Sequence, residues 1–131
     1  YMWQSDSFVT VEEGELARRT ANVQNYMSMT YFFARYVRDL GAISMQEAVR
    51  KATSMPAKHF HLEGRGVLAA GNYADVNVFD LNALKMNSTF SDVCRYSSGM
   101  DYVIVNGVPV IANGEHTGAR SGKTLRHLPK K

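Results

Sequence analysis

Residues 64–80 read GRGVLAAGNYADVNVFD, and they mark the point where the chain changes from a helical to a sheet-like pattern. Glycines at positions 64, 66 and 71 interrupt the stretch, and glycine readily adopts the positive φ angles of tight turns. The apolar run 67–70 and the alternating run 74–79 lie between and after them. Such alternation is typical of a strand with one buried face. The stretch therefore predicts two short strands joined by a turn, with Asp80 ending the second strand.

The longest helix is predicted before this stretch, over residues 27–40. Apolar side chains recur there at three- and four-residue spacings, which forms one apolar stripe along a helix. Ser28 or Thr30 is the expected N-cap, and Gly41 is placed as the glycine that follows a helix C-terminus. We interpret the Met and aromatic side chains of the stripe as core and not as a cofactor site.

Two shorter helices are expected to follow. Ser44 and Glu47 have the spacing of a capping box, so a helix is predicted from there to about residue 54. Pro56 suits the first position of a third helix, over residues 56–62. Nearer the N-terminus, residues 12–25 form a polar segment that is predicted to be a loop with a weak helical turn at 15–19.

Residues 101–105 and 108–112 are predicted to form a β-hairpin. The dipeptide Asn106-Gly107 lies between them, and both central residues of a type I′ turn need positive φ. Residues 82–98 are rich in polar and turn-forming residues and are expected to form a loop. Residues 1–4 and 125–128 are the remaining strand candidates, at the two ends of the chain.

The composition bounds the class of protein. The chain has 131 residues, of which 45% are hydrophobic, and this suffices for one domain with a core. No apolar run approaches the roughly 18 residues of a membrane-spanning helix, so no membrane partner is expected. A single cysteine, Cys94, excludes an internal disulfide and fits a reducing compartment, which predicts a cytoplasmic location. Because the chain begins inside an apolar run at Tyr1, we expect it to be a fragment of a longer protein.

The formal net charge is +3, and much of the positive charge lies in the last dozen residues. A nucleic-acid interface needs basic side chains clustered on a structured surface among aromatic ones. The tail lacks that pattern, so we expect a solvated tail and no nucleic-acid partner. Binding of DNA by the tail is a weaker alternative, which predicts an affinity that falls steeply with ionic strength.

The sequence His59-Phe60-His61 has a spacing that metal sites use, because alternate residues of a strand point the same way. The neighbouring Pro56 places the pair on a short helix instead. Residues two apart on a helix point about 200° apart, so the two imidazoles cannot share one ion there. We therefore interpret both histidines as surface or packing residues.

Asp6 is the other candidate for chemistry. It follows the apolar run 1–4 and is flanked by the hydroxyls of Ser5 and Ser7. The carboxyl ends of parallel strands are where α/β enzymes place catalytic groups. An Asp in this position also commonly caps a helix or forms a turn. The residues alone leave both interpretations open.

Three parts of the chain resemble the amidohydrolase superfamily, and within it the N-acyl-D-amino-acid deacylase (D-aminoacylase) branch. The first comprises RYVR at 35–38 and the segment 43–57, which closes with TSMPA. The second is the glycine-interrupted strand pair at 64–80, which is shared across the superfamily. The third is the segment 105–123, which contains VNG and then TGARSGK and is similar to the ending of the deacylases.

The resemblance implies an α/β plus β architecture. Residues 1–63 would be the C-terminal end of a (β/α)₈ barrel, with strand eight, the active-site loop and the last helices. Residues 64–131 would be the C-terminal part of a small β-sandwich or barrel domain. The barrel strands that carry the metal ligands would then lie upstream of this chain.

The resemblance also implies a zinc-dependent hydrolase of N-acyl-D-amino acids or related amides. Asp6 would act on the zinc-bound water, first as base and then as acid towards the leaving amine, and would contact the metal through that water. Ser5 and Arg19 are the implied substrate-binding residues. No bound zinc and no turnover are expected from the 131 residues alone.

Residues 17–20, ARRT, stand where the family usually has HPRT, so the substrate is the least defined part of this prediction. A non-catalytic scaffold or interaction domain that retains the fold is the alternative function. The expected partners are the upstream barrel portion and a small N-acyl amino acid. Because a lone strand eight exposes unpaired edges, self-association is also expected.

Overall fold

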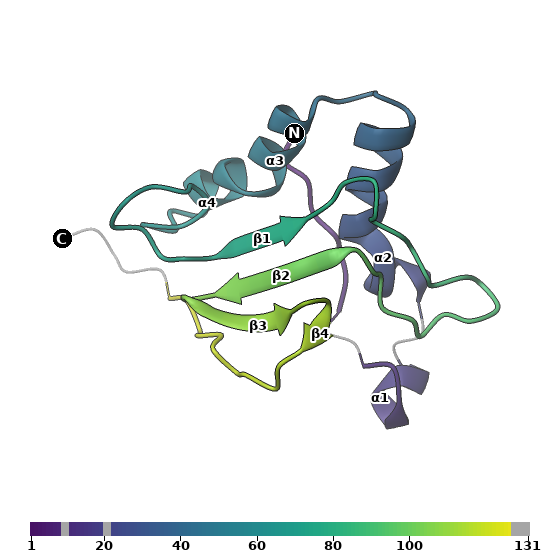
Figure 1. Ribbon diagram of the computed structural model, residues 1–131. Coiled ribbons are helices and arrows are strands. Elements are labelled where there is room, and N and C mark those ends of the chain that lie inside the picture. The colour runs from purple at the N-terminus through teal and green to yellow at the C-terminus, as the bar shows by residue number, and fades with distance from the viewer. Residues whose placement is uncertain (9–10, 20–21, 127–131) are drawn as a thin grey trace. The chain divides into compact units, whose positions relative to one another are not determined.

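The computed structural model describes residues 1–8, 11–19 and 22–126. Within these residues, four α-helices, one π-helix and four strands follow one another, and Figure 1 shows their arrangement. Their bounds are α1 Gly14–Arg19, α2 Val23–Tyr31, η1 Phe32–Asp39, α3 Met45–Ala52, α4 Ser54–His59, β1 Val76–Phe79, β2 Met100–Val105, β3 Val108–Ala112 and β4 Glu115–His116. The predicted change from helices to sheet after residue 63 is confirmed.

Packing divides the chain into two compact units, each of which is discontinuous in sequence. Unit 1 comprises Tyr1–Trp3, Gln46–Val78 and Met100–Lys131, and unit 2 comprises Gln4–Met45 and Phe79–Gly99. Unit 1 contains α4 and most of α3 and of the sheet, whereas unit 2 contains α1, α2 and η1. The predicted domain boundary between residues 63 and 64 separates the end of a barrel from a small β domain, and this assignment stays a prediction.

In unit 2, the helix predicted over residues 27–40 begins earlier than expected. Asn22 is its N-cap, because the side chain of Asn22 accepts a hydrogen bond from Gln24 N at 3.0 Å. The predicted caps, Ser28 and Thr30, lie inside α2, so that prediction is wrong. Helix α2 continues directly as η1, and Gly41 follows with a φ of 57°, as predicted for the residue after a helix C-terminus.

The core of unit 2 is built around η1. Phe33 is 7% exposed, and its ring meets that of Phe79 edge-on with the ring centroids 5.7 Å apart. Tyr26 and Leu84 are also buried. Of the predicted stripe, Phe33 is buried and Phe32 and Val37 are half-buried. Met29, Tyr36 and Leu40 are exposed, so the expectation that the stripe forms core is confirmed only in part. The predicted turn at 15–19 is confirmed as α1.

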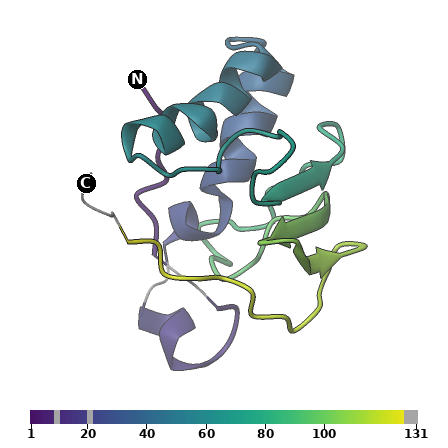
Figure 2. The same ribbon diagram turned by 90° about the vertical axis from the view of Figure 1, so that its left-hand side faces the viewer.

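In unit 1, α4 begins two residues after α3 ends, and Figure 2 shows the two as successive short coils. The predicted start of α3 after Ser44 is confirmed. Pro56 is the third residue of α4 and not the first, but it still lies in the first turn, where a missing N–H leaves no hydrogen bond unmade. The small side chains of Ala48 and Ala57 are the buried apolar residues of these helices.

The sheet has the order β1-β2-β3-β4, and in Figure 1 the arrows of β1 and β2 run in opposite directions. The predicted hairpin of β2 and β3 is confirmed, with φ angles of 51° for Asn106 and 81° for Gly107. A bulge lies in β2 between Val103 and Ile104. The short strand β4 pairs antiparallel with β3 and was not predicted.

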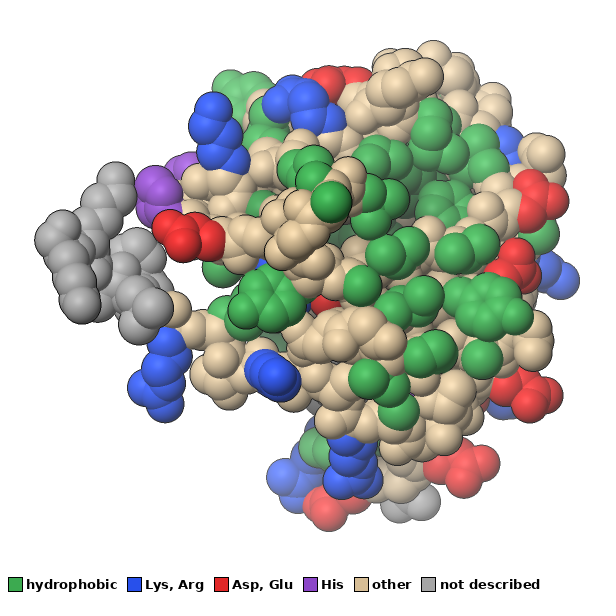
Figure 3. Space-filling view, turned by 60° about the vertical axis from the view of Figure 1, so that its left-hand side comes forward, with side chains coloured by type: hydrophobic (Ala, Val, Ile, Leu, Met, Phe, Trp, Pro, Cys, Tyr) green, Lys and Arg blue, Asp and Glu red, His purple; other side chains and the backbone are tan. Residues whose placement is uncertain are grey.

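The first of the two strands predicted within residues 64–80 is not formed. Residues 67–70 lie outside any strand, and the φ angles of 76° at Gly66 and 88° at Gly71 turn the backbone on either side of them. Tyr73 N donates to Gly64 O at 2.9 Å, which closes the segment as a loop. Leu68 is 76% exposed, and Figure 3 shows that other hydrophobic side chains also reach the surface.

The strand predicted at residues 1–4 is also not formed. Trp3 N donates a hydrogen bond to Lys51 O at 3.2 Å, and Lys51 Nζ donates to Tyr1 O at 2.6 Å. These bonds go to the last turn of α3, whereas a strand needs pairing with another strand. At the other end, residues 125 and 126 are irregular, and the rest of the predicted strand 125–128 lies outside the described residues.

Candidate functional site

Asp6 has an unusual backbone conformation. Its φ is 49°, in the left-handed region that residues other than glycine seldom adopt, although Asp tolerates it better than most. Its side chain is exposed, and among the described residues the carboxylate has no hydrogen-bond partner. Such conformations are often found at functional sites, because the surrounding structure must hold them in place.

The loop that carries Asp6 is fastened to the first turn of α2, within unit 2. Gln24 Nε2 donates to Ser5 O at 2.6 Å and to Asp6 O at 3.0 Å. Ser7 Oγ donates to Gln24 O at 3.2 Å and lies 3.0 Å from the Oγ of Ser28. The loop is therefore held by several hydrogen bonds, while its one carboxylate faces solvent.

The two predicted substrate-binding residues lie in different surroundings. Ser5 is half-buried and precedes Asp6 in the same loop, where its carbonyl accepts bonds from Gln24 and from Ser7 Oγ. The guanidinium of Arg19 pairs with Glu15 one turn earlier on α1, and both side chains are exposed. A substrate-binding role for Ser5 or Arg19 stays a prediction.

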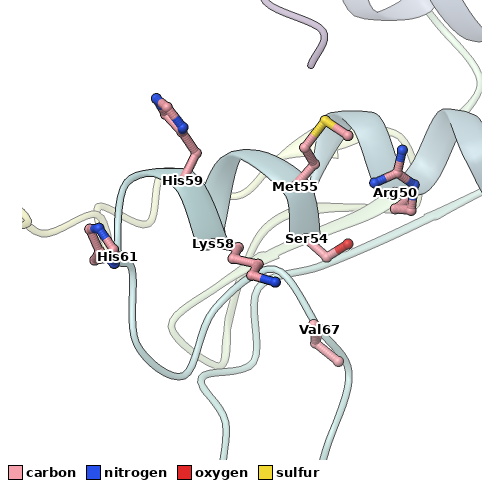
Figure 4. Close-up of a pocket in the computed structure, with 7 residues that line it drawn as sticks. All are labelled: Arg50, Ser54, Met55, Lys58, His59, His61 and Val67. Carbon is pink, nitrogen blue, oxygen red and sulfur yellow. The ribbon is translucent and has the colours of Figure 1, made fainter. Parts of the chain in front are cut away.

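An open depression of about 740 Å³ lies beside α4 in unit 1 (Figure 4). The two histidines considered at the sequence level both line it, and Figure 4 shows their rings pointing in different directions. The ring of His59 meets that of Phe60 edge-on at a centroid distance of 5.0 Å. Helix α4 ends at His59, and His61 lies beyond it with a φ of 53°, so the prediction that both histidines lie on one helix over residues 56–62 is wrong.

The positive charge of this depression is partly neutralised. Arg50 donates two hydrogen bonds to Glu47, at 2.6 and 2.7 Å. These bonds from Arg50 lower the pKa of the Glu47 carboxyl to about 2, so the two side chains remain an ion pair at neutral pH. The exposed Lys58 adds a single further charge. The depression is therefore open and carries little net charge.

The described residues do not fit a metal centre. Among residues 1–8, 11–19 and 22–126, no group of three or more His, Cys, Asp or Glu side chains is placed to hold a metal ion. Zinc and similar ions need three or four such ligands. In the same ranges, no helix has the length and apolar character needed to cross a membrane.

Gln24 is the site residue that the sequence did not reveal. It lies 18 residues from Asp6 in the chain, and glutamine is common on helix surfaces. The polar residue Asn22 two positions earlier is a helix-capping signal, which would have placed Gln24 in the first turn of α2. No local pattern indicated that this turn contacts the Asp6 loop.

Residues 14–111 match the sequence profile of the Amidohydrolase family. A D-aminoacylase of Alcaligenes xylosoxydans xylosoxydans is 40% identical over 90 residues, which cover 69% of this chain and 19% of that protein. The chain spans about a fifth of the length of the curated relatives it matches.

The solved structures that are similar to the chain include a D-aminoacylase and an N-acyl-D-glutamate deacylase. A crystal structure of D-aminoacylase, described as defining a novel subset of amidohydrolases, superimposes with a TM-score of 0.77 at 31% identity and covers 81% of this chain and 22% of that one. An N-acyl-D-glutamate deacylase from Bordetella bronchiseptica, in complex with zinc and a phosphonate inhibitor, gives a TM-score of 0.72 at 34% identity and the same coverage. The predicted resemblance to this branch is confirmed.

Proposed function

The chain belongs to the amidohydrolase family, and on this premise we propose that it forms the C-terminal part of a metal-dependent hydrolase of N-acyl-D-amino acids. The enzyme would cleave the amide, a C–N bond outside a peptide chain, and release a carboxylic acid and a D-amino acid. The similarity to D-aminoacylase and to N-acyl-D-glutamate deacylase supports this substrate class.

Asp6 is the observation that carries the proposal. Its carboxylate is exposed, and its loop is held on α2 in a left-handed conformation that costs free energy. A folded chain that maintains such a conformation at an acidic residue supports a role in chemistry. A turn-forming Asp would more commonly direct its carboxylate to a nearby backbone N–H.

In the proposed reaction, Asp6 transfers protons. Its carboxylate accepts a proton from the water that attacks the amide carbonyl, and the resulting carboxylic acid then donates a proton to the leaving nitrogen. Proton transfer by a positioned side chain typically accelerates such a step about 100- to 10,000-fold. The carboxylate ends the cycle ionised, as it began. Ser5 and Arg19 would contact the substrate.

The proposed metal, zinc, would be held by residues outside the described part of this chain. The described residues contain no group of three or more metal-ligating side chains, so they would contribute the proton-transferring carboxylate but not the metal ligands. We expect no stoichiometric zinc and no turnover from the 131 residues alone.

The barrel portion of the same enzyme would be the partner of this chain. The side chains of Leu68 and Tyr73 are 76% and 55% exposed, which supports association with further protein. The single cysteine supports a cytoplasmic location.

The test compares Asp6→Asn with Asp101→Asn in the longer protein that includes this chain, assayed with N-acetyl-D-amino acids. Asp101 is also exposed and serves as the control. We expect Asp6→Asn to lower kcat at least about 100-fold with no change in folding or metal content, and Asp101→Asn to have little effect. Full activity of Asp6→Asn would refute the catalytic role of Asp6, and no turnover by the unaltered longer protein would favour a scaffold. Turnover by the 131 residues alone would refute the dependence on further protein.

A further inference from the structure

We propose that Gln24 is a positioning residue that fixes the direction of the Asp6 carboxylate. This inference rests on the proposed function, because positioning matters to the reaction only if Asp6 transfers protons. Gln24 does not touch the reacting atoms in this proposal. It acts through the backbone of Asp6, and its contacts lie entirely within unit 2.

A single side-chain amide holds both peptide planes of Asp6. The Ser5 carbonyl belongs to the peptide plane before the Asp6 Cα atom, and the Asp6 carbonyl belongs to the plane after it. Gln24 Nε2 donates one hydrogen bond to each, at 2.6 and 3.0 Å. An amide nitrogen has two N–H groups, so its donors are fully used. Because φ and ψ describe how these two planes are rotated about Cα, the pair of bonds fixes both angles.

The conformation that Gln24 holds is one that Asp6 would leave if released. At a φ of 49° an L-residue brings its Cβ close to the following carbonyl, which costs roughly 1–2 kcal/mol. Two hydrogen bonds of ordinary strength contribute about 1 kcal/mol each and can offset that cost. The Cα–Cβ bond direction follows from the backbone angles, so release would swing the carboxylate away from its present direction.

Gln24 is itself well anchored. It is the second residue of α2, and its backbone N–H donates to the Asn22 side chain at 3.0 Å. Its carbonyl accepts from the Oγ atoms of Ser7 and Ser28, which holds the loop at a second point. The amide of Gln24 therefore projects from a capped helix end and not from a mobile loop, as a positioning residue requires.

The experiment uses Gln24→Glu and Gln24→Leu in the longer protein, with Gln46→Leu as the matched control. Gln46 is the second residue of α3, is exposed and lies outside the Asp6 loop. Glu has nearly the shape of Gln and is favoured in the first turn of a helix, but its carboxylate cannot donate to carbonyls. Gln24→Glu therefore removes the two bonds while keeping α2 folded, even if Gln24→Leu weakens the helix.

We expect both Gln24 variants to lower kcat per folded molecule about 10- to 100-fold with KM changed much less, because misplacing a catalytic group by about 1 Å has that effect. NMR of the 131-residue chain should show a changed backbone coupling constant and faster motion at the Asp6 amide in both variants. Gln46→Leu should change none of these quantities.

The outcomes separate this proposal from the one on which it rests. If Asp6→Asn abolishes turnover but Gln24→Glu leaves kcat and the Asp6 amide unchanged, the positioning role is wrong and the proposed function stands. If Asp6→Asn remains fully active, the proton-transfer role of Asp6 in the proposed function is wrong, and any effect of Gln24→Glu on kcat is then structural. A lower stability without a selective loss of kcat would also overturn the positioning role.

Discussion

Arg65 and Asp75 form an ion pair that joins the start of the 64–80 stretch to its strand. The guanidinium of Arg65 contacts the Asp75 carboxylate and donates to Asn106 Oδ1 at 2.6 Å, and it lies 4.2 Å from the ring centroid of Tyr73. Asp75 in turn accepts a hydrogen bond from Asn106 N at 2.8 Å. The pair therefore ties the loop to the turn of the β2–β3 hairpin.

Replacing Arg65 by Ala should destabilise unit 1. The Arg65 side chain is 11% exposed and that of Asp75 is 32% exposed, so the loss of Arg65 leaves the Asp75 carboxylate without its cation. Hydrogen bonds to charged groups contribute about 1.5–3 kcal/mol, and we expect a loss of that size in the free energy of unfolding from urea titrations. Arg19→Ala is the control, because the Arg19–Glu15 pair is more than 70% exposed and should contribute less than about 0.5 kcal/mol. Equal effects of the two changes would contradict the prediction.

The contribution of Asp75 should depend on pH. Burial acts to raise the pKa of Asp75, but the hydrogen bonds from Asn106 N and Arg65 and the charge of Arg65 outweigh it, so its pKa is lowered. A folded-state pKa below the unfolded value of about 3.9 adds stability above that value, and this stability is lost as the pH falls through the lowered pKa.

The test measures urea unfolding of the natural chain and of Asp75→Asn between pH 7 and pH 2. The difference in unfolding free energy should be largest above about pH 5 and should shrink as the pH falls below about 4. Glu47→Gln is the comparison, because the Glu47 pKa is also lowered but its partner Arg50 is on the exposed surface of α3, where solvent screens the pair, so its difference should be smaller. A difference for Asp75→Asn that stays constant across the range would contradict the assignment.

Gly66 and Gly107 should respond differently to replacement by Ala. Both have φ near +80°, so each substitution costs roughly 1 kcal/mol of backbone strain. A Cβ on Gly107 would meet nothing within 4 Å, whereas a Cβ on Gly66 would lie 2.6 Å from Ala57 Cβ and 2.8 Å from Thr53 O. We therefore expect Gly66→Ala to cost about 1–3 kcal/mol more than Gly107→Ala.

Gly122→Ala is the matched control for this pair. Gly122 lacks a positive φ, and a Cβ there would meet nothing within 4 Å among the described residues. Its replacement should change the unfolding free energy by less than about 0.5 kcal/mol. If Gly66→Ala and Gly107→Ala lowered the unfolding free energy equally, the inference that the Gly66 turn packs closely on α4 would be wrong.

Elements with strong local signals could be predicted from the sequence. The dipeptide Asn106-Gly107 specified its hairpin turn, and Ser44 with Glu47 specified the start of α3, because each signal acts within a few residues. The run 67–70 was predicted as a strand on its apolar composition alone. A strand also needs a neighbour to pair with, and the turns at Gly66 and Gly71 close this segment as a loop.

The candidate site could be predicted only in part. Asp6 was identified from its position after an apolar run and from the resemblance, although that run does not form a strand here. The contact between Asp6 and Gln24 spans 18 residues and depends on where α2 begins. Since α2 begins four residues before the predicted start, Gln24 was assigned to a loop, and its contact with Asp6 could not be inferred.

Arg38 should be important for the stability of unit 2. Its Nη1 donates to Leu81 O at 3.1 Å and to Leu84 O at 2.7 Å, which joins η1 to the turn after β1. Leu84 is only 4% exposed, so its carbonyl would lose a partner that water replaces poorly. We expect Arg38→Ala to cost about 2–3 kcal/mol and to speed hydrogen exchange at Leu84 N, which donates to Asp80 O at 3.2 Å.

Two further variants show whether the bonds to the carbonyls are the cause. Arg38→Lys keeps the charge but replaces the planar guanidinium by a single ammonium group. It should therefore restore less than half of the unfolding free energy that Arg38→Ala loses. Arg95→Ala removes an Arg whose side chain is 57% exposed and pairs with Asp92, and it should cost less than about 0.5 kcal/mol. If Arg38→Lys were as stable as the natural chain, the charge of Arg38, and not the geometry of its guanidinium, would be responsible for the stabilisation. If hydrogen exchange at Leu84 N were unchanged in Arg38→Ala, the inference that Arg38 joins η1 to the turn after β1 and stabilises it would be wrong.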